Sequence, residues 1–178
     1  MGGAERASRA TACTSVMVTR GQVANALWLQ LGWWLCIWGA STPWVLVLVP
    51  MGLALHLWTC TQPRAEAWAL LRVTVAGCLL DSLLGIFGVF DFDAWPLPLW
   101  LASMWLVLAS GLRHSLAWAG RPFLRGAVVG AVAGPLAYLG GARLADVALP
   151  LGPLATTLVL VPIWALALPL LVRLAAWR

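Results

Sequence analysis

Long runs without a charged residue constrain the fold of this chain more than any other feature. No Asp, Glu, Lys or Arg occurs between residues 147 and 172, and most side chains in that run are apolar. About 20 apolar residues are enough for a helix to cross the hydrocarbon core of a bilayer. Of all 178 residues, 62% are hydrophobic and 10% are charged, whereas soluble domains average about 45–50% apolar and about 25% charged residues. This composition excludes a water-soluble globular protein and a disordered chain, and it predicts an all-α integral membrane protein.

Six apolar segments follow one another and predict a single six-helix transmembrane bundle over residues 23–176. The breaks between them are rich in Pro, Gly, Asp and Arg, which are typical of turns and membrane interfaces. The second segment is short and contains Pro50, so a tilted or re-entrant helix remains an alternative there. Residues 1–22 are small and polar, and they predict a flexible N-terminal tail. The predicted spans are 23–40, 44–59, 67–90, 97–116, 126–143 and 153–173.

Basic residues are distributed unequally between the two sides that six spans would define. Cytoplasmic loops of membrane proteins carry an excess of Lys and Arg. Here Arg143 alone falls on one side, with three aspartates, and all other arginines fall on the opposite side. Five or seven spans would break this alternation, so we expect both termini to be cytoplasmic. The arginines on the expected cytoplasmic side are Arg6, Arg9, Arg20, Arg64, Arg72, Arg113, Arg121, Arg125, Arg173 and Arg178.

Amino-acid usage also indicates where such a protein resides. The chain has no Lys and is rich in Arg, Ala and Gly, which is typical of GC-rich bacterial coding DNA. We therefore expect a multi-pass protein of the bacterial inner (cytoplasmic) membrane.

The fifth segment carries small residues at helical spacing. Gly126, Gly130 and Gly134 lie four residues apart, and Pro135 follows them. Small faces allow helices to approach closely in lipid, so we expect this segment to lie at the centre of the bundle. Pro135 removes a backbone donor and predicts a kink.

Asp81 lies deep inside the third span, and Gly77 and Gly85 share its helical face. An ionised carboxylate at membrane depth is costly unless it is paired, and such residues face the protein interior. A rise of about 1.5 Å per residue places Asp81, Tyr138 and Arg143 at similar depth in the outer half of the bilayer. We therefore predict that Asp81 contacts Arg143, Tyr138 or both. Such a contact would be either structural or part of a substrate or proton site.

A second group of ionisable residues falls near the cytoplasmic ends of three spans. His56, Arg72, Arg113 and His114 lie at comparable depth. They predict either a pocket for an anionic headgroup or carboxylate, or arginines that extend to the interface beside ordinary interfacial histidines. Gln30 and Asn25 add polar groups to the inner half of the first span, where interhelical hydrogen bonding is the usual role. Gln30 is also a candidate for a buried polar or binding residue.

Motifs that carry known chemistry are missing from the sequence. There is no Walker loop, dinucleotide-binding glycine motif, H-E-x-x-H or G-x-S-x-G. The two histidines lie far apart in the sequence, so they predict at most part of a metal site. We therefore expect no cofactor and no metal, name no catalytic residue, and find no support for an enzyme. The scattered arginines disfavour nucleic acid as a partner, which leaves membrane lipids and other membrane proteins.

Several stretches taken in order resemble a known family. They are residues 25–33, Asp81 in an apolar run, the Pro98-Leu-Trp100 triplet with Trp105, residues 112–118 with their His-Ser pair, and residues 134–143 with their Gly-Pro-Leu-x-Tyr sequence. Together they resemble the bacterial membrane-protein family called domain of unknown function 2878, over about residues 23–176. The resemblance implies a polytopic inner-membrane protein with no settled activity and no catalytic residues to carry over.

Three functions remain open from the sequence. The first is a protein that handles a lipid or small molecule within the bundle, which the ionisable groups at depth favour. The second is a structural or accessory membrane subunit without its own chemistry, which the short loops favour. The third is an intramembrane enzyme that modifies lipids and uses His114 or Asp81.

Overall fold

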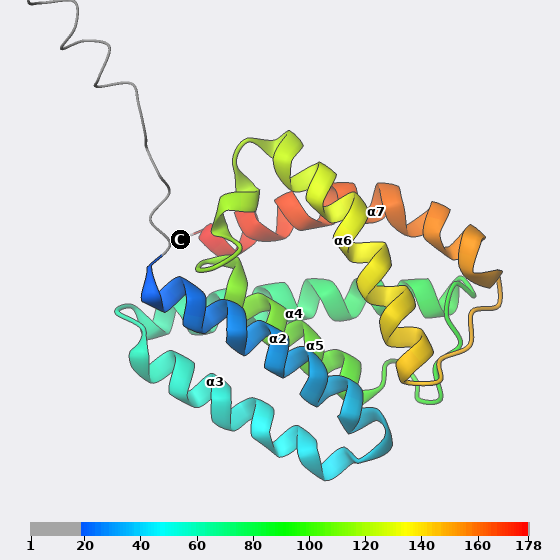
Figure 1. The fold of residues 1–178 in the computed structure, drawn as a ribbon, viewed down its shortest axis with the longest axis horizontal. Coiled ribbons are helices and arrows are strands. Elements are labelled where there is room, and N and C mark those ends of the chain that lie inside the picture. Colours follow the sequence, from blue (N-terminus) through cyan, green and yellow to red (C-terminus); the bar gives the residue numbers. More distant parts are fainter. Residues whose placement is uncertain (1–18, 178) are drawn as a thin grey trace, which may run out of the picture.

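The computed structural model describes residues 19–177, and these residues form a bundle of helices (Figure 1). Within that range, the only β-type pairing is a single antiparallel bridge between Asp91 and Ala148, which joins two loops. The all-helical class predicted from the apolar segments is confirmed. The helices are α2 (Arg20–Ser41), the 3-10 helix η1 (Pro43–Val47), α3 (Leu48–Thr59), α4 (Pro63–Ile86), α5 (Leu99–Leu112), the 3-10 helix η2 (Ala117–Gly120), α6 (Phe123–Leu144) and α7 (Gly152–Ala176).

The first helix begins inside the segment that the sequence predicts as a tail. Thr19 and Gln22 form a capping box: the Thr19 hydroxyl oxygen accepts a hydrogen bond from the Gln22 backbone N–H, and the Gln22 side-chain oxygen accepts one from the Thr19 backbone N–H. Two of the N–H groups that a helix start leaves unpaired are satisfied in this way. α2 therefore begins at Arg20, and the last residues of the predicted 1–22 tail are helical. The rest of that tail, with Arg6 and Arg9, lies outside the described residues, as does Arg178.

The second predicted span consists of two helices in series, η1 and α3. Pro43 opens η1, and Pro50 is the third residue of α3. Neither proline interrupts the helix that contains it, because the first backbone N–H groups of a helix have no acceptor within it. The other boundaries lie within four residues of those predicted, and the largest differences are at both ends of α4 and at the end of α5.

Successive helices run in alternating directions, so the start of α2 and the end of α7 lie at the same end of the bundle (Figure 1). α5 occupies the centre, where it packs against α2, α3, α4 and α7. α6 instead lies at the edge and packs on α7 and η2. The prediction that the glycine-rich segment is central is therefore wrong. Small residues allow one close contact in lipid, but they do not require neighbours on several sides.

The close contact that the glycines allow is with α7. A Cβ added at Gly130 would lie 2.1 Å from the backbone oxygen of Trp164, and one at Gly134 would lie 2.1 Å from the Trp164 side chain. A Cβ at Gly126 would lie 2.1 Å from the backbone oxygen of Ala119 in η2. These three positions can hold only glycine while α6 keeps its present distance from its neighbours.

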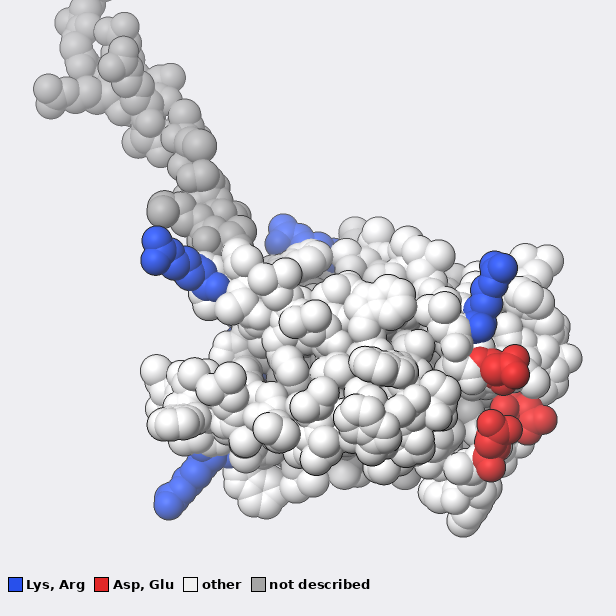
Figure 2. All heavy atoms as spheres, turned by 60° about the horizontal axis from the view of Figure 1, so that its bottom comes forward, with Lys and Arg blue, Asp and Glu red and all other residues white. Residues whose placement is uncertain are grey.

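On the face seen in Figure 2, charged side chains lie at the two ends of the bundle and the surface between them is uncharged. α4, α6 and α7 each have the length and apolar composition of a membrane span. Large apolar side chains face outward from the long helices, among them Leu27, Leu79, Leu136 and Leu158. Exposed apolar surface on this scale is typical of a face that contacts lipid or another protein. α5 has 14 residues and is about 21 Å long, which is shorter than the hydrocarbon core of about 30 Å.

Candidate functional site

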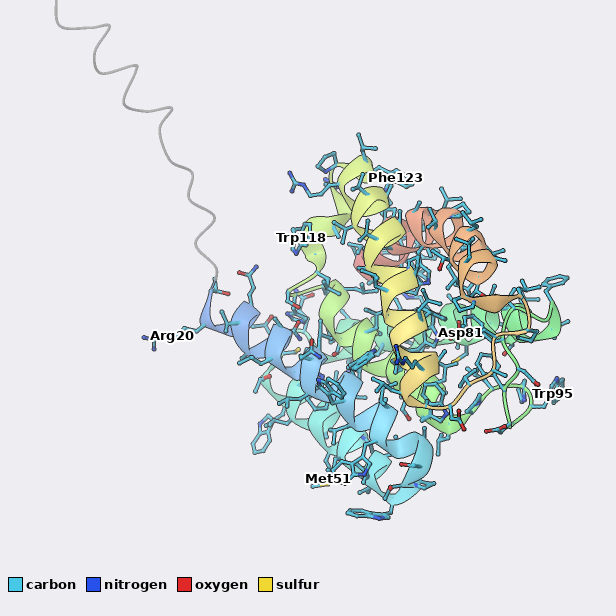
Figure 3. The ribbon with its side chains drawn as sticks, turned by 45° about the vertical axis from the view of Figure 1, so that its right-hand side comes forward. Arg20, Met51, Asp81, Trp95, Trp118 and Phe123 are labelled. Atoms are coloured by element: carbon cyan, nitrogen blue, oxygen red, sulfur yellow. The ribbon has the colours of Figure 1, made fainter. Side chains whose placement is uncertain are left out.

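Asp81 in α4 lies in the interior of the bundle (Figure 3), and its side chain is fully buried. Both of its carboxylate oxygens accept hydrogen bonds from aromatic side chains. The Tyr138 hydroxyl donates to Oδ1 at 2.5 Å, and the Trp105 indole N–H donates to Oδ2 at 2.6 Å. Gly77 makes room for this arrangement, because the Trp105 ring lies against its Cα. The predicted contact between Asp81 and Tyr138 is therefore present, and Trp105 is a second donor that the sequence analysis missed.

Arg143 does not take part in this arrangement. Its side chain is exposed at the end of α6, and no salt bridge to it occurs within residues 19–177. Arg143 follows Tyr138 by five positions, which rotates it by about 140° around the helix axis. The depth estimate was similar for both residues, but only Tyr138 lies on the face of α6 that is directed toward Asp81. The alternative in which Arg143 contacts Asp81 is therefore wrong.

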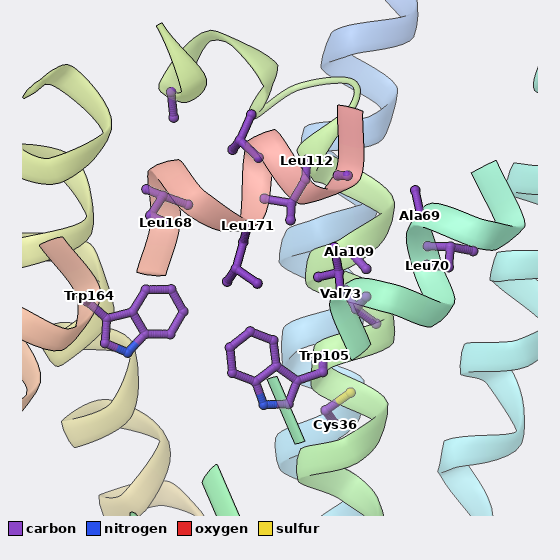
Figure 4. Packing of buried hydrophobic residues seen from close by; sticks show 14 of the residues in the cluster. Cys36, Ala69, Leu70, Val73, Trp105, Ala109, Leu112, Trp164, Leu168 and Leu171 are labelled. Carbon is purple, nitrogen blue, oxygen red and sulfur yellow. The ribbon is translucent and has the colours of Figure 1, made fainter. Parts of the chain in front are cut away.

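An apolar cavity of about 230 Å³ adjoins Trp105 and Tyr138, the two donors to Asp81, and we call it the aromatic cavity. α5, α6 and α7 form most of its wall. The Trp105 and Trp164 rings are parallel, with centroids 5.8 Å apart (Figure 4), and the Tyr138 ring meets Trp164 edge-on at 5.6 Å. Further residues in the wall are Trp33, Phe90, Met104, Leu108, Ala137 and Leu168.

One buried polar atom in the wall of the aromatic cavity has no partner. The indole Nε1 of Trp164 makes no hydrogen bond to any described residue, although the side chain is only 6% exposed. A buried N–H without an acceptor costs about 1–3 kcal/mol. The Trp164 ring therefore lines the cavity, and its N–H is an unpaired donor that is itself buried beside Tyr138.

A wider cleft adjoins the aromatic cavity and opens between α2 and α6. The two spaces share five wall residues, which are Trp33, Met104, Leu108, Leu116 and Ala137. Gln30 lies in the wall of this cleft and is exposed, so the expectation that it is a buried polar residue is wrong. Asn25, five positions earlier in α2, is buried and makes the expected interhelical hydrogen bonds, since it donates to the Ser110 backbone oxygen and accepts from the Ser115 hydroxyl.

Glu66 is the centre of a second polar site at the opposite end of α4. Its Oε1 lies 3.1 Å from His56 Nε2 and 3.2 Å from His114 Nε2, and its Oε2 lies 3.5 Å from Arg113 Nε. The Cys60 Sγ lies 3.7 Å from His56 Nε2 and 4.0 Å from His114 Nε2. We call these five residues the Glu66 cluster. Burial and the Glu66 carboxylate raise the pKa of the Cys60 thiol above its usual value.

The structure thus brings together His56, Arg113 and His114 as the sequence predicted, but not Arg72. Arg72 donates to the backbone oxygen of Trp177 at 2.7 Å and lies over the Trp177 ring. Arg72 follows Glu66 by six positions, which places it about 120° away around the axis of α4. The inclusion of Arg72 in this group is therefore wrong.

Glu66 and Cys60 were missed, although the sequence carries a signal for both. Cys60 follows His56 by four positions, which aligns the two side chains at the end of one helix. Glu66 lies in the first turn of the next helix, only six residues after Cys60. The two histidines are far apart in the sequence, but their ring centroids are 5.0 Å apart, so together they supply two of the possible ligands of a metal site.

The fold and these two sites define an all-helical membrane protein with an apolar cavity in its interior and a cluster of ionisable side chains near one end. The chain belongs to the family described as protein of unknown function (DUF2878), whose model matches residues 22–170. The resemblance noted from the sequence is confirmed. No match was found among curated proteins or among solved structures.

Proposed function

We propose that this protein binds a lipid, or a similarly apolar small molecule with one polar group, in the aromatic cavity. The observation that carries the proposal is the free indole N–H of Trp164 in an apolar wall. Ligand sites in proteins are mostly apolar and hold a few polar groups that orient the ligand. An ester carbonyl or hydroxyl oxygen placed at Trp164 would satisfy the buried donor.

Asp81 has a supporting role in this proposal. Both of its oxygens already accept hydrogen bonds, and its side chain has no exposed surface. Asp81 therefore acts on a ligand only through the two side chains that it holds, Tyr138 and Trp105. Together they fix the aromatic part of the wall that α5 and α6 contribute, and Trp164 contacts the polar group of the ligand.

A photoreactive phospholipid tests the proposal. The full chain is reconstituted in vesicles that contain a phospholipid with a diazirine in its acyl chain, and labelled peptides are mapped after irradiation. Label on α5 reports entry into the cavity, because α5 lies at the centre of the bundle. Ala137→Trp fills the space shared by the cavity and the cleft, so we expect α5 labelling to fall several-fold.

Val132→Trp is the matched control, because Val132 lies on the exposed outer face of the same helix. We expect this variant to label α5 as the unmodified chain does. Equal α5 labelling in both variants, or no α5 labelling in the unmodified chain, would contradict lipid binding. The second result is the one expected of a structural subunit without a ligand.

We also propose that six helical segments cross the bacterial inner membrane and that both termini are cytoplasmic. The alternating helix directions support this topology, as does the position of Arg143 at the end opposite Arg20 and Arg64. Reporters active only in the periplasm, fused after Asp93 or Asp146, should be active. The same reporters fused after Arg64, Arg121 or Arg178 should be inactive, and activity at Arg121 would contradict this threading.

A further inference from the structure

We propose that His56, Cys60, Glu66 and His114 bind a divalent transition-metal ion of the Zn²⁺ type. Each of these residues offers one ligand atom, and the four atoms lie within 4.8 Å of one another. The set consists of two imidazoles, a thiol and a carboxylate. This site is separate from the aromatic cavity, and the proposal does not depend on lipid binding.

The distances between the ligand atoms fit tetrahedral coordination. Bonds of about 2.0–2.1 Å to nitrogen or oxygen and about 2.3 Å to sulfur place ligand atoms roughly 3.4 Å apart, or roughly 3.6 Å where sulfur is one of them. Glu66 Oε1 lies 3.1 Å from His56 Nε2 and 3.2 Å from His114 Nε2. Cys60 Sγ lies 3.7 Å and 4.0 Å from the same two nitrogens. An ion would therefore require only small side-chain movements.

His56 and His114 both direct Nε2 toward the position proposed for the ion. The Glu66 carboxylate is oriented so that one of its oxygens remains available to bind the ion. Arg113 Nε lies 3.5 Å from Glu66 Oε2, which leaves Oε1 directed toward the two histidines. Carboxylates that bind metals are commonly held by such an outer partner. Glu66 and Cys60 would contribute two negative charges against the divalent ion, and Arg113 lies outside the four ligands.

The chemistry of the ligand set favours zinc-type ions over Ca²⁺ and Mg²⁺. Those two ions take oxygen ligands almost exclusively, whereas imidazole and thiolate select zinc and its transition-metal neighbours. Four protein ligands are typical of a structural site. The ligands come from the end of α3, the turn after it, the start of α4 and the turn after α5, so the ion would hold the ends of three helices together. The His114 side chain is 35% exposed, which provides a path for the ion to enter.

The alternative is a cluster held only by hydrogen bonds and charge pairs, and the two arrangements make different demands on Cys60. Without a metal the thiol contributes only weak hydrogen bonds, whereas with a metal it is a ligand. The test therefore uses the full chain, purified in detergent, stripped with a chelator and loaded with Co²⁺ or Zn²⁺. We expect about one tightly held ion per chain, a thiolate-to-cobalt charge-transfer band with Co²⁺, and a higher melting temperature with Zn²⁺ than after stripping.

Variants locate the ion. Cys60→Ser should abolish the charge-transfer band, and Glu66→Gln should weaken Zn²⁺ binding at least about 10-fold. Cys78→Ser is the matched control, since this thiol lies in α4 outside the cluster, and it should bind as the unmodified chain does. Size-exclusion elution identifies any variant that fails to fold, and the unmodified chain before and after stripping provides a comparison without substitution. Failure to retain Zn²⁺ after dialysis, or an unchanged cobalt spectrum in Cys60→Ser, would overturn the proposal.

Discussion

The indole of Trp105 in α5 lies directly over the Cα of Gly77 in α4, so closely that a Cβ at Gly77 would come within 2.0 Å of the ring. This contact places the Trp105 N–H against Asp81, which lies one helical turn further along α4. Asp81 is the one fully buried carboxylate among the described residues. Both its hydrogen bond to Trp105 and the packing of α4 against α5 therefore require that Gly77 has no side chain.

Gly77→Ala should displace Trp105 and weaken its hydrogen bond to Asp81. Overpacking in a well-filled interior costs about 1–3 kcal/mol, so we expect a lower melting temperature in detergent. Gly140→Ala is the control, because no atom lies within 4 Å of the position of its Cβ. A melting temperature for Gly77→Ala equal to that of Gly140→Ala would show that the ring moves aside at no cost.

Gly130→Ala should be more damaging than Gly77→Ala. The new methyl group would lie 2.1 Å from the backbone oxygen of Trp164, and a helix backbone cannot rotate away as a side chain can. α6 must then separate from α7, which opens the wall of the aromatic cavity. Faster proteolysis in the loop between α6 and α7, together with a lower melting temperature, would report this separation. Unchanged proteolysis would contradict the close packing described here.

Asp81→Asn should destabilise the protein although the two side chains have nearly the same shape. The amide has one acceptor oxygen, whereas two donors, from Tyr138 and Trp105, are directed at this side chain. One donor is left without an acceptor, at a cost of about 1–3 kcal/mol. Asp81→Asn combined with Trp105→Phe removes the second donor as well, so we expect the double variant to recover part of the loss. If the losses of stability in Asp81→Asn and Trp105→Phe simply add in the double variant, Asp81 and Trp105 are not energetically coupled.

Asn25→Ala should lower stability by about 1–3 kcal/mol, because a buried amide that bonds to the end of α5 and to Ser115 is lost. Gln30→Ala is a suitable control in the same helix, since Gln30 is exposed. We expect the control to melt within a degree or two of the unmodified chain, because such surface substitutions change stability by about 0.5 kcal/mol or less. Similar losses in both variants would mean that Asn25 has no special role.

Trp164→Phe should weaken lipid binding without closing the aromatic cavity. Phenylalanine keeps an aromatic ring in the wall but removes the free N–H, and one hydrogen bond contributes about 0.5–1.5 kcal/mol, or up to about 10-fold in affinity. Labelling of α5 by the diazirine phospholipid should fall, while labelling by a photoreactive hydrocarbon without a carbonyl or hydroxyl group should not. Equal effects on both probes would indicate that shape alone governs binding.

The sequence predicted the helices well because their signal is local. Continuous apolar runs bounded by Pro, Gly and charge define each helix to within a few residues, whatever lies beside it. The pairing of Asp81 with Tyr138 was also accessible, since depth follows from the rise per residue and a buried carboxylate needs donors. The predicted contact between Asp81 and Arg143 was wrong because the rise along α6 gives the depth of Arg143 but not the direction of its side chain around the helix axis.

What the sequence could not supply is the identity of neighbours. The four-residue spacing of Gly126, Gly130 and Gly134 indicates a close helix contact. The same spacing suits a helix at the edge of the bundle and a helix at its centre. Glu66, His56 and His114 come from three different elements, and only the way α5 ends beside α3 and α4 brings them together. Cys60 has a local signal at four residues from His56, but alone it is indistinguishable from an inert thiol.

The opening between α2 and α6 has a consequence for how a bound molecule would be exchanged. Its rim includes exposed residues on both helices, among them Gln30 and Leu136, and it continues to the wall of the aromatic cavity. A hydrocarbon tail would then enter the aromatic cavity laterally from the surrounding leaflet, without contact with water. Occupancy would then follow the mole fraction of that molecule among the neighbouring lipids, and its concentration in the aqueous phase would be irrelevant.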